Sequence, residues 1–125
     1  MDRIFLEGTN RLPKIILDKQ VENFEISGNS NHRNVNDYFL PVFEWIDNYT
    51  KDPLEKTVFK FKMNYYDSVS SLLIFRIFQK LQLLKDIGNQ VHVKWFYREN
   101  DDNIFDVGVD FKEIFLLDID LIKQN

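Results

Sequence analysis

A long strand pattern runs directly into a long helix pattern in this chain, and this succession limits the fold more than any other feature. Apolar and polar side chains alternate through EKTVFKFKMNYY (55–66), the period of two that is typical of a strand with one buried face. Between about Ser70 and Ile87 the apolar residues return every three or four positions, as on the buried face of a helix, and Gly88 is well placed to end it. This succession predicts a sheet with helices packed against it.

The rest of the chain contains the same two kinds of pattern. The first three strand patterns follow one another through short turns, which predicts an antiparallel meander. Pro41 lies inside the first helix pattern, where it removes one backbone hydrogen bond and is expected to kink or divide the helix. The remaining elements that we expect are strands at 3–7, 13–18, 22–28, 90–97 and 114–122, and helices at 35–49 and 101–111.

Strands at the beginning and an alternation of strands and helices afterwards predict the α/β class in its mixed, α+β form, with one mixed sheet packed with helices. The chain has 125 residues, of which 44% are hydrophobic. This is enough for one sizeable core and short for two. We therefore expect a single domain over residues 1–125.

Composition excludes several classes of function. The formal net charge is −4 and no run of Lys and Arg can neutralise a phosphate backbone, so nucleic acid is not an expected partner. Because cysteine is absent, the chain has no disulfide, no thiolate nucleophile and no cysteine-ligated metal. The first residues lack the apolar region of a signal peptide, and no apolar stretch approaches a membrane span in length. We expect a cytoplasmic protein that does not insert into membranes.

The residue types that carry catalysis form no recognisable pattern. His32 and His92 are isolated, and the chain has no glycine-rich phosphate loop and no nucleophile elbow. The run RENDDN offers Glu99, Asp101 and Asp102, yet it lacks the glycine and the distal glutamate of a calcium loop. Acidic residues at a helix start are explained by the helix dipole alone. We expect no catalytic residue, no metal site and no cofactor, and therefore not an enzyme.

Three serines lie where the long strand ends and the long helix begins, in DSVSS (67–71). The first N–H groups of a helix have no partner within it, and the hydroxyl of Ser68 or Ser70 can accept a hydrogen bond from them as an N-cap. The same position also suits a phosphate, because the helix dipole and the free N–H groups favour negative charge. The residues alone leave both uses of these hydroxyls open.

Several segments of the chain occur in an order that is shared with a known family. They cover nearly the whole chain and together resemble the SiaC family of bacterial regulatory phosphoproteins. The likeness is most specific in the Gly-Thr turn before Pro13, the proline before the helix tryptophan, and the Trp-aromatic-Tyr strand with its acidic exit. The segments are EGTNRLPKIILD (7–18), FEISGNS (24–30), NVNDYFLPVFEWIDNY (34–49), KMNYYDSVSSLLIFRIFQKL (62–81) and VHVKWFYRENDDNIFDVGVDF (91–111).

The resemblance implies a fold similar to STAS domains and a role in partner switching. Proteins of this kind are phosphorylated on one hydroxyl by a Ser/Thr kinase, are restored by a PP2C-type phosphatase, and bind a target protein in one state only. For this family the implied target is a diguanylate cyclase. The resemblance therefore links the chain to cyclic-di-GMP signalling, aggregation and biofilm formation.

The resemblance also indicates which residues take part. The family's phosphorylated threonine follows an aromatic pair, and in YYDSVSSL the corresponding residue is Ser68. The family stretch reads Asn-Thr-Ser-Ser-Ser-Lys, from which this chain departs, so a constitutive protein-binding adaptor of the same fold without phospho-control is the alternative. The neighbours of Ser68 that are expected to cap the helix or bind a partner are Asp67, Ser70, Ser71 and Leu72.

Overall fold

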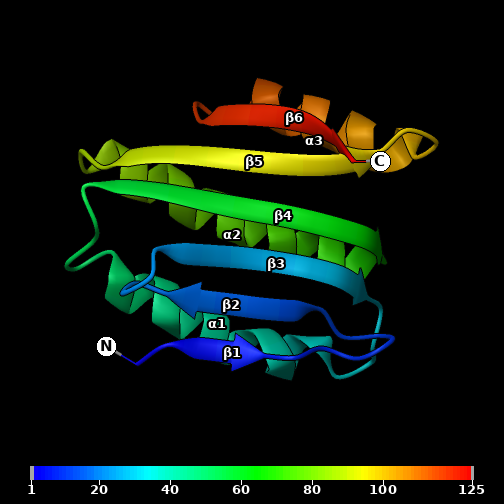
Figure 1. The fold of residues 1–125 in the computed structure, drawn as a ribbon, viewed down its shortest axis with the longest axis horizontal. Helices are drawn as coiled ribbons and strands as arrows, with labels where there is room; N and C mark the ends of the chain where they lie inside the picture. The colour runs from blue at the N-terminus through cyan, green and yellow to red at the C-terminus, as the bar shows by residue number, and fades with distance from the viewer. Residues whose placement is uncertain (1, 125) are drawn as a thin grey trace.

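One mixed sheet of six strands, which follow one another in chain order, forms the frame of the structure (Figure 1). The computed structural model describes residues 2–124, so the first and last residues of the expected domain lie outside the described part. Strands β1 to β3 pair antiparallel, and β3 to β6 pair parallel. The strands are β1 (Ile4–Leu6), β2 (Lys14–Asp18), β3 (Asn23–Ser30), β4 (Lys56–Tyr66), β5 (Gln90–Arg98) and β6 (Asp118–Gln124).

Three helices connect the parallel strands and cover one face of the sheet. They are α1 (Val35–Tyr49), α2 (Ser68–Asp86) and α3 (Asp102–Ile114). A connection between two neighbouring parallel strands is almost always right-handed. Because β3, β4, β5 and β6 follow one another in the same direction across the sheet, their three helices all lie on the same face. Figure 1 shows all three helices behind the strands, with α2 between α1 and α3. Helix α2 is therefore the central helix of its layer.

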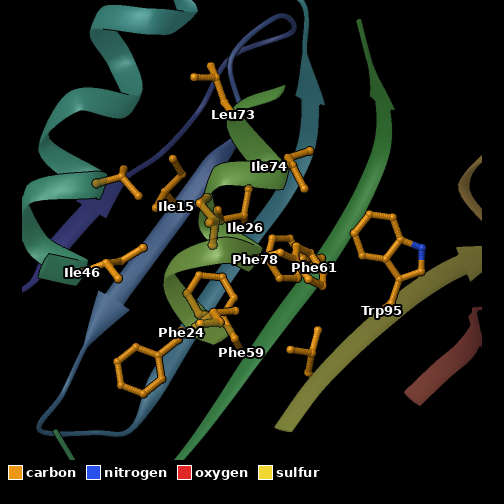
Figure 2. Close-up of a cluster of buried hydrophobic side chains, with 14 of the residues drawn as sticks. Ile15, Phe24, Ile26, Ile46, Phe59, Phe61, Leu73, Ile74, Phe78 and Trp95 are labelled. Atoms are coloured by element: carbon orange, nitrogen blue, oxygen red, sulfur yellow. The ribbon is translucent and has the colours of Figure 1, made fainter. Parts of the chain in front are cut away.

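The core lies between the sheet and the helices and is rich in aromatic rings. Every second residue of β4 points into it, so this strand contributes Phe59 and Phe61, while α2 contributes Phe78. The centre of the Phe61 ring lies 4.8 Å from that of Phe78 and 5.6 Å from that of Trp95, distances that suit aromatic packing. Figure 2 shows these rings, together with Phe24, in the buried cluster.

The fold class expected from the sequence is confirmed, and the first three strands form the expected meander. Pro41 does not divide the first helix, because α1 is continuous from Val35 to Tyr49. Its missing N–H costs one hydrogen bond, whereas six buried side chains hold α1 on the sheet. No helix within residues 2–124 is both long and apolar enough to cross a membrane.

The end of the chain differs from the strand expected at 114–122. Helix α3 includes the first of these residues, and β6 begins only at Asp118. The segment between them packs on the helices: the Leu116 N–H donates to the Gln82 side chain at 2.7 Å, and Phe115 is buried. Of the apolar residues before Asp118, Phe115 and Leu117 are buried, whereas Leu116 is exposed. This alternation resembles that of a strand, and the pattern does not distinguish packing on the core from strand pairing.

Helix α3 lies so close to the sheet that Gly108 cannot be enlarged without displacement. A Cβ atom on Gly108 would lie 2.5 Å from Cδ1 of Trp95 and 2.6 Å from Cδ2 of Leu121. The indole N–H of Trp95 also donates to the Ile104 carbonyl at 2.8 Å, so the ring has little freedom to move. We expect Gly108→Ala to lower the free energy of unfolding by about 1–3 kcal/mol through overpacking.

Urea unfolding followed by tryptophan fluorescence measures this loss. Asp106→Ala is the matched control, because Asp106 is exposed on the same helix and the change should stay within about 0.5 kcal/mol. Equal stabilities of the two variants would contradict the close packing of α3.

Candidate functional site

Helix α2 begins at the edge of the sheet where β3 and β4 end, and the three serines singled out in the sequence lie there. The last register pair of the two strands is Ser30 with Tyr66, and α2 starts two residues after Tyr66. The parallel strands all end at this edge, so the helices that follow them all begin there (Figure 1). Such an edge gathers helix N-termini, which favour negative charge.

A bulge at Asn64 decides which tyrosine faces the helices at this edge. Asn64 has no partner in register, because β3 pairs with Met63 before it and with Tyr65 after it. One extra residue reverses the alternation of the strand. As a result Tyr66 is half-buried and packs against the core, whereas Tyr65 is 55% exposed.

Asp67, rather than Ser68 or Ser70, is the N-cap of α2. Its backbone is extended, and its carboxylate accepts a hydrogen bond from the Ser70 N–H at 2.9 Å. The Asp67 carbonyl accepts the Ser71 N–H, also at 2.9 Å. Of the residues that were expected to cap the helix or bind a partner, Asp67 is therefore the cap, and the alternative of a Ser68 or Ser70 hydroxyl as the N-cap is wrong. Aspartate caps helices as well as serine does, so the capping signal was present in the sequence at Asp67.

Ser70 attaches α2 to the end of β3 through its hydroxyl. Ser70 and Ser30 are both fully buried, and Ser70 Oγ lies 2.7 Å from both the carbonyl oxygen and Oγ of Ser30. A serine hydroxyl has one proton, so Ser70 donates to the carbonyl and accepts from the Ser30 hydroxyl. The Ser30 carbonyl also accepts the Asp67 N–H at 3.1 Å. Nothing in the sequence pattern singled out Ser30, because its partner lies 40 positions away.

Ser68 differs from Ser70 in that its side chain is exposed. It is the first residue of α2, where the backbone N–H groups of the first turn and the helix dipole favour negative charge. The Asp67 carboxylate already holds the Ser70 N–H. A group attached to Ser68 would therefore be accessible from solvent, which is not true of a group on Ser70.

Apolar side chains border Ser68 on the exposed side of α2. Val69 follows it directly and is 42% exposed, and Leu72, one helical turn further on, is 66% exposed. Ser71 is half-buried on the flank of the helix. The structure thus brings Asp67, Ser68 and Leu72 together at one accessible helix start and leaves Ser70 beneath it.

The hydroxyl of Tyr66 is buried at the same edge of the sheet. Among residues 2–124 no group forms a hydrogen bond with this buried oxygen. Burial, followed by the negative charge of Asp101, raises the pKa of Tyr66 to about 12. The hydroxyl is therefore neutral at physiological pH and contributes a desolvation cost rather than a contact.

The histidines have local partners. His92 lies on β5 with Nδ1 2.8 Å from an Asp118 oxygen and Nε2 3.1 Å from an Asp120 oxygen, both on β6. His32 Nδ1 accepts the Asn34 N–H at 3.0 Å. His92 thus joins the two last strands on the sheet face that is opposite the helices, away from the start of α2.

The acidic residues after β5 also form contacts with their neighbours. The Asp101 carboxylate accepts the Ile104 N–H at 3.0 Å and caps α3, and Glu99 lies 3.7 Å from the Lys123 ammonium. In the range 2–124 no group of three or more His, Asp and Glu side chains is arranged to hold a metal ion. Asp101 thus stabilises the start of α3 as its N-cap, which agrees with the helix-start explanation given for these acidic residues.

A surface hollow lies away from these groups. It measures about 610 Å³ and lies between the N-terminal segment and α1, with Arg3, Glu44 and Trp45 in its wall. Its lining residues include no hydroxyl and no histidine that could act as a nucleophile and its base. The exposed start of α2 remains the candidate site.

Comparison with known proteins identifies one family. The sequence profile of the SiaC family, described as SiaC family regulatory phosphoprotein, matches residues 6–124. No curated protein matches the chain significantly.

Two solved structures have the same fold. The crystal structure of apo-SiaC from Pseudomonas aeruginosa is 20% identical, with a TM-score of 0.88 over 98% of this chain and 99% of that one. In the crystal structure of the diguanylate cyclase SiaD in complex with its activator SiaC, also from Pseudomonas aeruginosa, the matching chain is 19% identical. Its TM-score is 0.90 over 97% of this chain and 99% of that one. At such identities the likeness shows the fold alone.

The buried contact between Ser70 and Ser30 should contribute measurably to stability. Ser70→Ala leaves the Ser30 hydroxyl buried without its acceptor and removes one donor from the Ser30 carbonyl, so we expect a loss of about 1–3 kcal/mol in the free energy of unfolding. Thermal unfolding by circular dichroism checks this. Ser71→Ala is the control and should stay near wild type. Ser30→Ala combined with Ser70→Ala should cost less than the sum of the single changes, and strict additivity would argue against a direct contact.

The Tyr66 hydroxyl should make the folded state sensitive to alkali. The pKa of this group is 10.0 when unfolded and about 12 when folded, so stability is complete below pH 10 and falls as the pH rises from 10 to about 12. Tyr66→Phe should reduce this fall without loss of stability at pH 7, because the hydroxyl forms no hydrogen bond within residues 2–124.

Chemical unfolding measured between pH 7 and 12 tests this expectation. Some dependence should remain in Tyr66→Phe, since burial also raises the pKa of Tyr38. Tyr65→Phe serves as the control at an exposed position and should lose as much stability between pH 10 and 12 as the wild type does. A Tyr66→Phe variant that loses stability at pH 7 would reveal a hydrogen bond at this hydroxyl.

Proposed function

Because this chain belongs to the SiaC family of regulatory phosphoproteins, we propose that it is a non-enzymatic signalling switch that is phosphorylated reversibly on Ser68. The observation that carries this proposal is the contrast between two hydroxyls at the start of α2. Ser68 is exposed at the first position of the helix, whereas Ser70 is fully buried against Ser30. A kinase can reach the first hydroxyl without disturbing the second.

Local charges favour a phosphate that points outward from the helix. A phosphoserine adds about −1.5 to −2 charges, which the first-turn N–H groups and the helix dipole stabilise. The Asp67 carboxylate, hydrogen-bonded to the Ser70 N–H, repels the phosphate from the inner side of the same turn. The added charge therefore falls on the exposed surface beside Val69 and Leu72.

That surface is the proposed contact for a partner protein. A dianionic group is costly to bury in an apolar interface, so a partner that covers Val69 and Leu72 would bind the unmodified chain and lose affinity after phosphorylation. We propose a Ser/Thr kinase and a PP2C-type phosphatase as the enzymes that set this state. SiaC of Pseudomonas aeruginosa has been solved in complex with a diguanylate cyclase as its activator, which supports a diguanylate cyclase as the target here. The setting would be cyclic-di-GMP signalling in the cytoplasm.

One observation favours a second function, a constitutive adaptor of the same fold. The Asp67 carboxylate lies next to Ser68 in the sequence. A kinase would therefore have to attach a negatively charged phosphate beside a negatively charged side chain. If that charge prevents modification, the surface at Leu72 binds its partner in a single state.

A charge introduced at Ser68 should separate these functions. We expect Ser68→Glu to weaken binding to the diguanylate cyclase of the same host by at least about tenfold, while Ser68→Ala binds as wild type. Isothermal calorimetry with the purified cyclase measures the affinity, and the rate of cyclic-di-GMP formation reports activation. Asn103→Asp is the matched control, because it adds one charge at an exposed first-turn position of α3.

Mass spectrometry of the chain from its native host completes the test. Phosphate on Ser68 together with loss of binding in Ser68→Glu supports the switch. Equal binding of Ser68→Glu and wild type, with no phosphate found on Ser68, supports the adaptor and contradicts the switch.

A further inference from the structure

Strand β1 forms one edge of the sheet. It pairs with β2 on one side, and no strand among residues 2–124 pairs with its other side (Figure 1). The backbone N–H and C=O groups along such an edge can pair with a further strand. Ile4 and Leu6 pack against the core, so the alternation of the strand turns Phe5, which is 51% exposed, to the open face opposite the helices. The edge therefore offers both backbone groups and an apolar side chain to a partner.

The charges on either side of Phe5 make this edge complementary to itself. In RIFLE (3–7), Arg3 and Glu7 lie on the same face as Phe5, one before it and one after it at equal distance, and both are exposed. When two such strands pair antiparallel about Phe5, Arg3 of each copy lies directly opposite Glu7 of the other. Opposite charges at facing positions stabilise antiparallel strands. Arg3 also lies 3.8 Å from Asp18 of its own chain, and a guanidinium has donors for both carboxylates.

The apolar residues of β1 also face one another in this register. The two Phe5 rings meet at the centre of the contact, and Ile4 of each copy lies opposite Leu6 of the other on the helix side. Aromatic and aliphatic pairs across two strands are stabilising. Ile4 and Trp45 line the hollow of about 610 Å³ beside β1, so Leu6 of the second copy would lie against this hollow. The second strand therefore covers apolar surface that β1 leaves accessible.

We propose that two copies of this chain pair through β1, antiparallel and centred on Phe5, so that their two sheets become one continuous sheet. Addition of a strand to an exposed sheet edge is a recurrent mode of recognition. The contact is self-complementary, as a dimer with two-fold symmetry requires. Because the two-fold axis is perpendicular to the sheet, both helical layers lie on the same side. The two copies of Ser68 then face in one direction, and a partner with two binding sites can hold both at once.

Charged residues at a sheet edge commonly prevent pairing, but their arrangement in β1 favours it. Edge charges of one sign repel a second copy. Arg3 and Glu7 have opposite signs and are placed symmetrically about the centre of the strand. At the other edge of the sheet, β6 carries Asp118 and Asp120 on its open face, so two antiparallel β6 strands would gather acidic side chains there. The charges thus favour a second copy at β1 and not at β6.

Sedimentation equilibrium of the purified chain measures the proposed dimer. We expect a concentration-dependent equilibrium between monomer and dimer in the wild type. Arg3→Glu gathers carboxylates at the contact and should raise the dissociation constant of the dimer at least about tenfold, and Glu7→Arg should do the same by gathering guanidinium groups. Lys112→Glu is the control, because it makes the same change in net charge at an exposed position of α3, on the far side of the helical layer from α1 (Figure 1). Circular dichroism checks that all three variants are folded.

A mixture of the two variants separates a direct contact from a general effect of charge. In a mixed pair the Arg3→Glu chain contributes two carboxylates and the Glu7→Arg chain contributes two guanidinium groups, so both ion pairs form again. A dissociation constant restored to near the wild-type value in the mixture supports the proposal. A mixture that associates no better than either variant alone overturns it. A wild-type chain that stays monomeric up to about 1 mM, or a dimer that Arg3→Glu leaves unchanged, overturns it as well.

A single introduced cysteine tests the register, because the chain has no cysteine of its own. The Cβ atoms of directly opposite residues in antiparallel strands lie about 4.5–5.5 Å apart, so a small adjustment allows a disulfide. Phe5→Cys should therefore form a disulfide-linked dimer on oxidation. Val21→Cys is the control, because Val21 is also exposed but lies in the turn between β2 and β3, and it should cross-link at least about tenfold less. Equal cross-linking of the two variants, or none at Phe5→Cys, contradicts pairing about Phe5.

Discussion

The carbonyl and hydroxyl of Ser30 determine how the candidate site is built, because they hold the start of α2 against the end of β3. The carbonyl accepts both the Asp67 N–H and the Ser70 hydroxyl, and Ser30 and Ser70 are fully buried. Buried hydrogen bonds are costly to leave unmade, so the first turn of α2 has one favourable rotation about its axis. That rotation turns Ser70 inward and leaves Ser68 and Leu72 on the exposed side.

The bulge at Asn64 makes this contact possible. Without an extra residue, the alternation of β4 would turn Tyr65 inward and Tyr66 outward, and the chain would enter α2 from the wrong face. With the bulge, Tyr66 lies beside Ser30 in register, and the next residue, Asp67, donates to the Ser30 carbonyl. A local irregularity of one strand therefore sets the orientation of the helix that carries the candidate site.

The periodicity of the hydrophobic residues predicted the fold well but predicted the candidate site only in part. The period of two in β4 and of three to four in α2 reflects burial on one face, which is a local property of the sequence. The contact between Ser30 and Ser70 joins residues 40 positions apart and leaves no local trace. The cap could not be assigned to one residue for a different reason: several residues of DSVSS can cap a helix, and only the backbone conformation at Asp67 decides among them. The strand expected from 114 onward was wrong because Phe115 and Leu117 are buried in alternation with exposed residues, as they would be in a strand.

The geometry of α2 also limits how a phosphate on Ser68 can act. Since Asp67 and Ser70 hold the helix start through their own hydrogen bonds, the proposed phosphorylation of Ser68 would require no movement of α2, and its effect would be one of local charge. At physiological ionic strength the influence of an exposed charge decays over about 8 Å, which reaches Val69 and Leu72 but not a side chain about 22 Å away. A partner that covers Leu72 and extends further along α2 would therefore lose contact energy at one end while its more distant contacts persist. Such a switch weakens a complex by a graded amount, so that the concentrations of the two proteins, as well as the phosphate, decide how much partner is released.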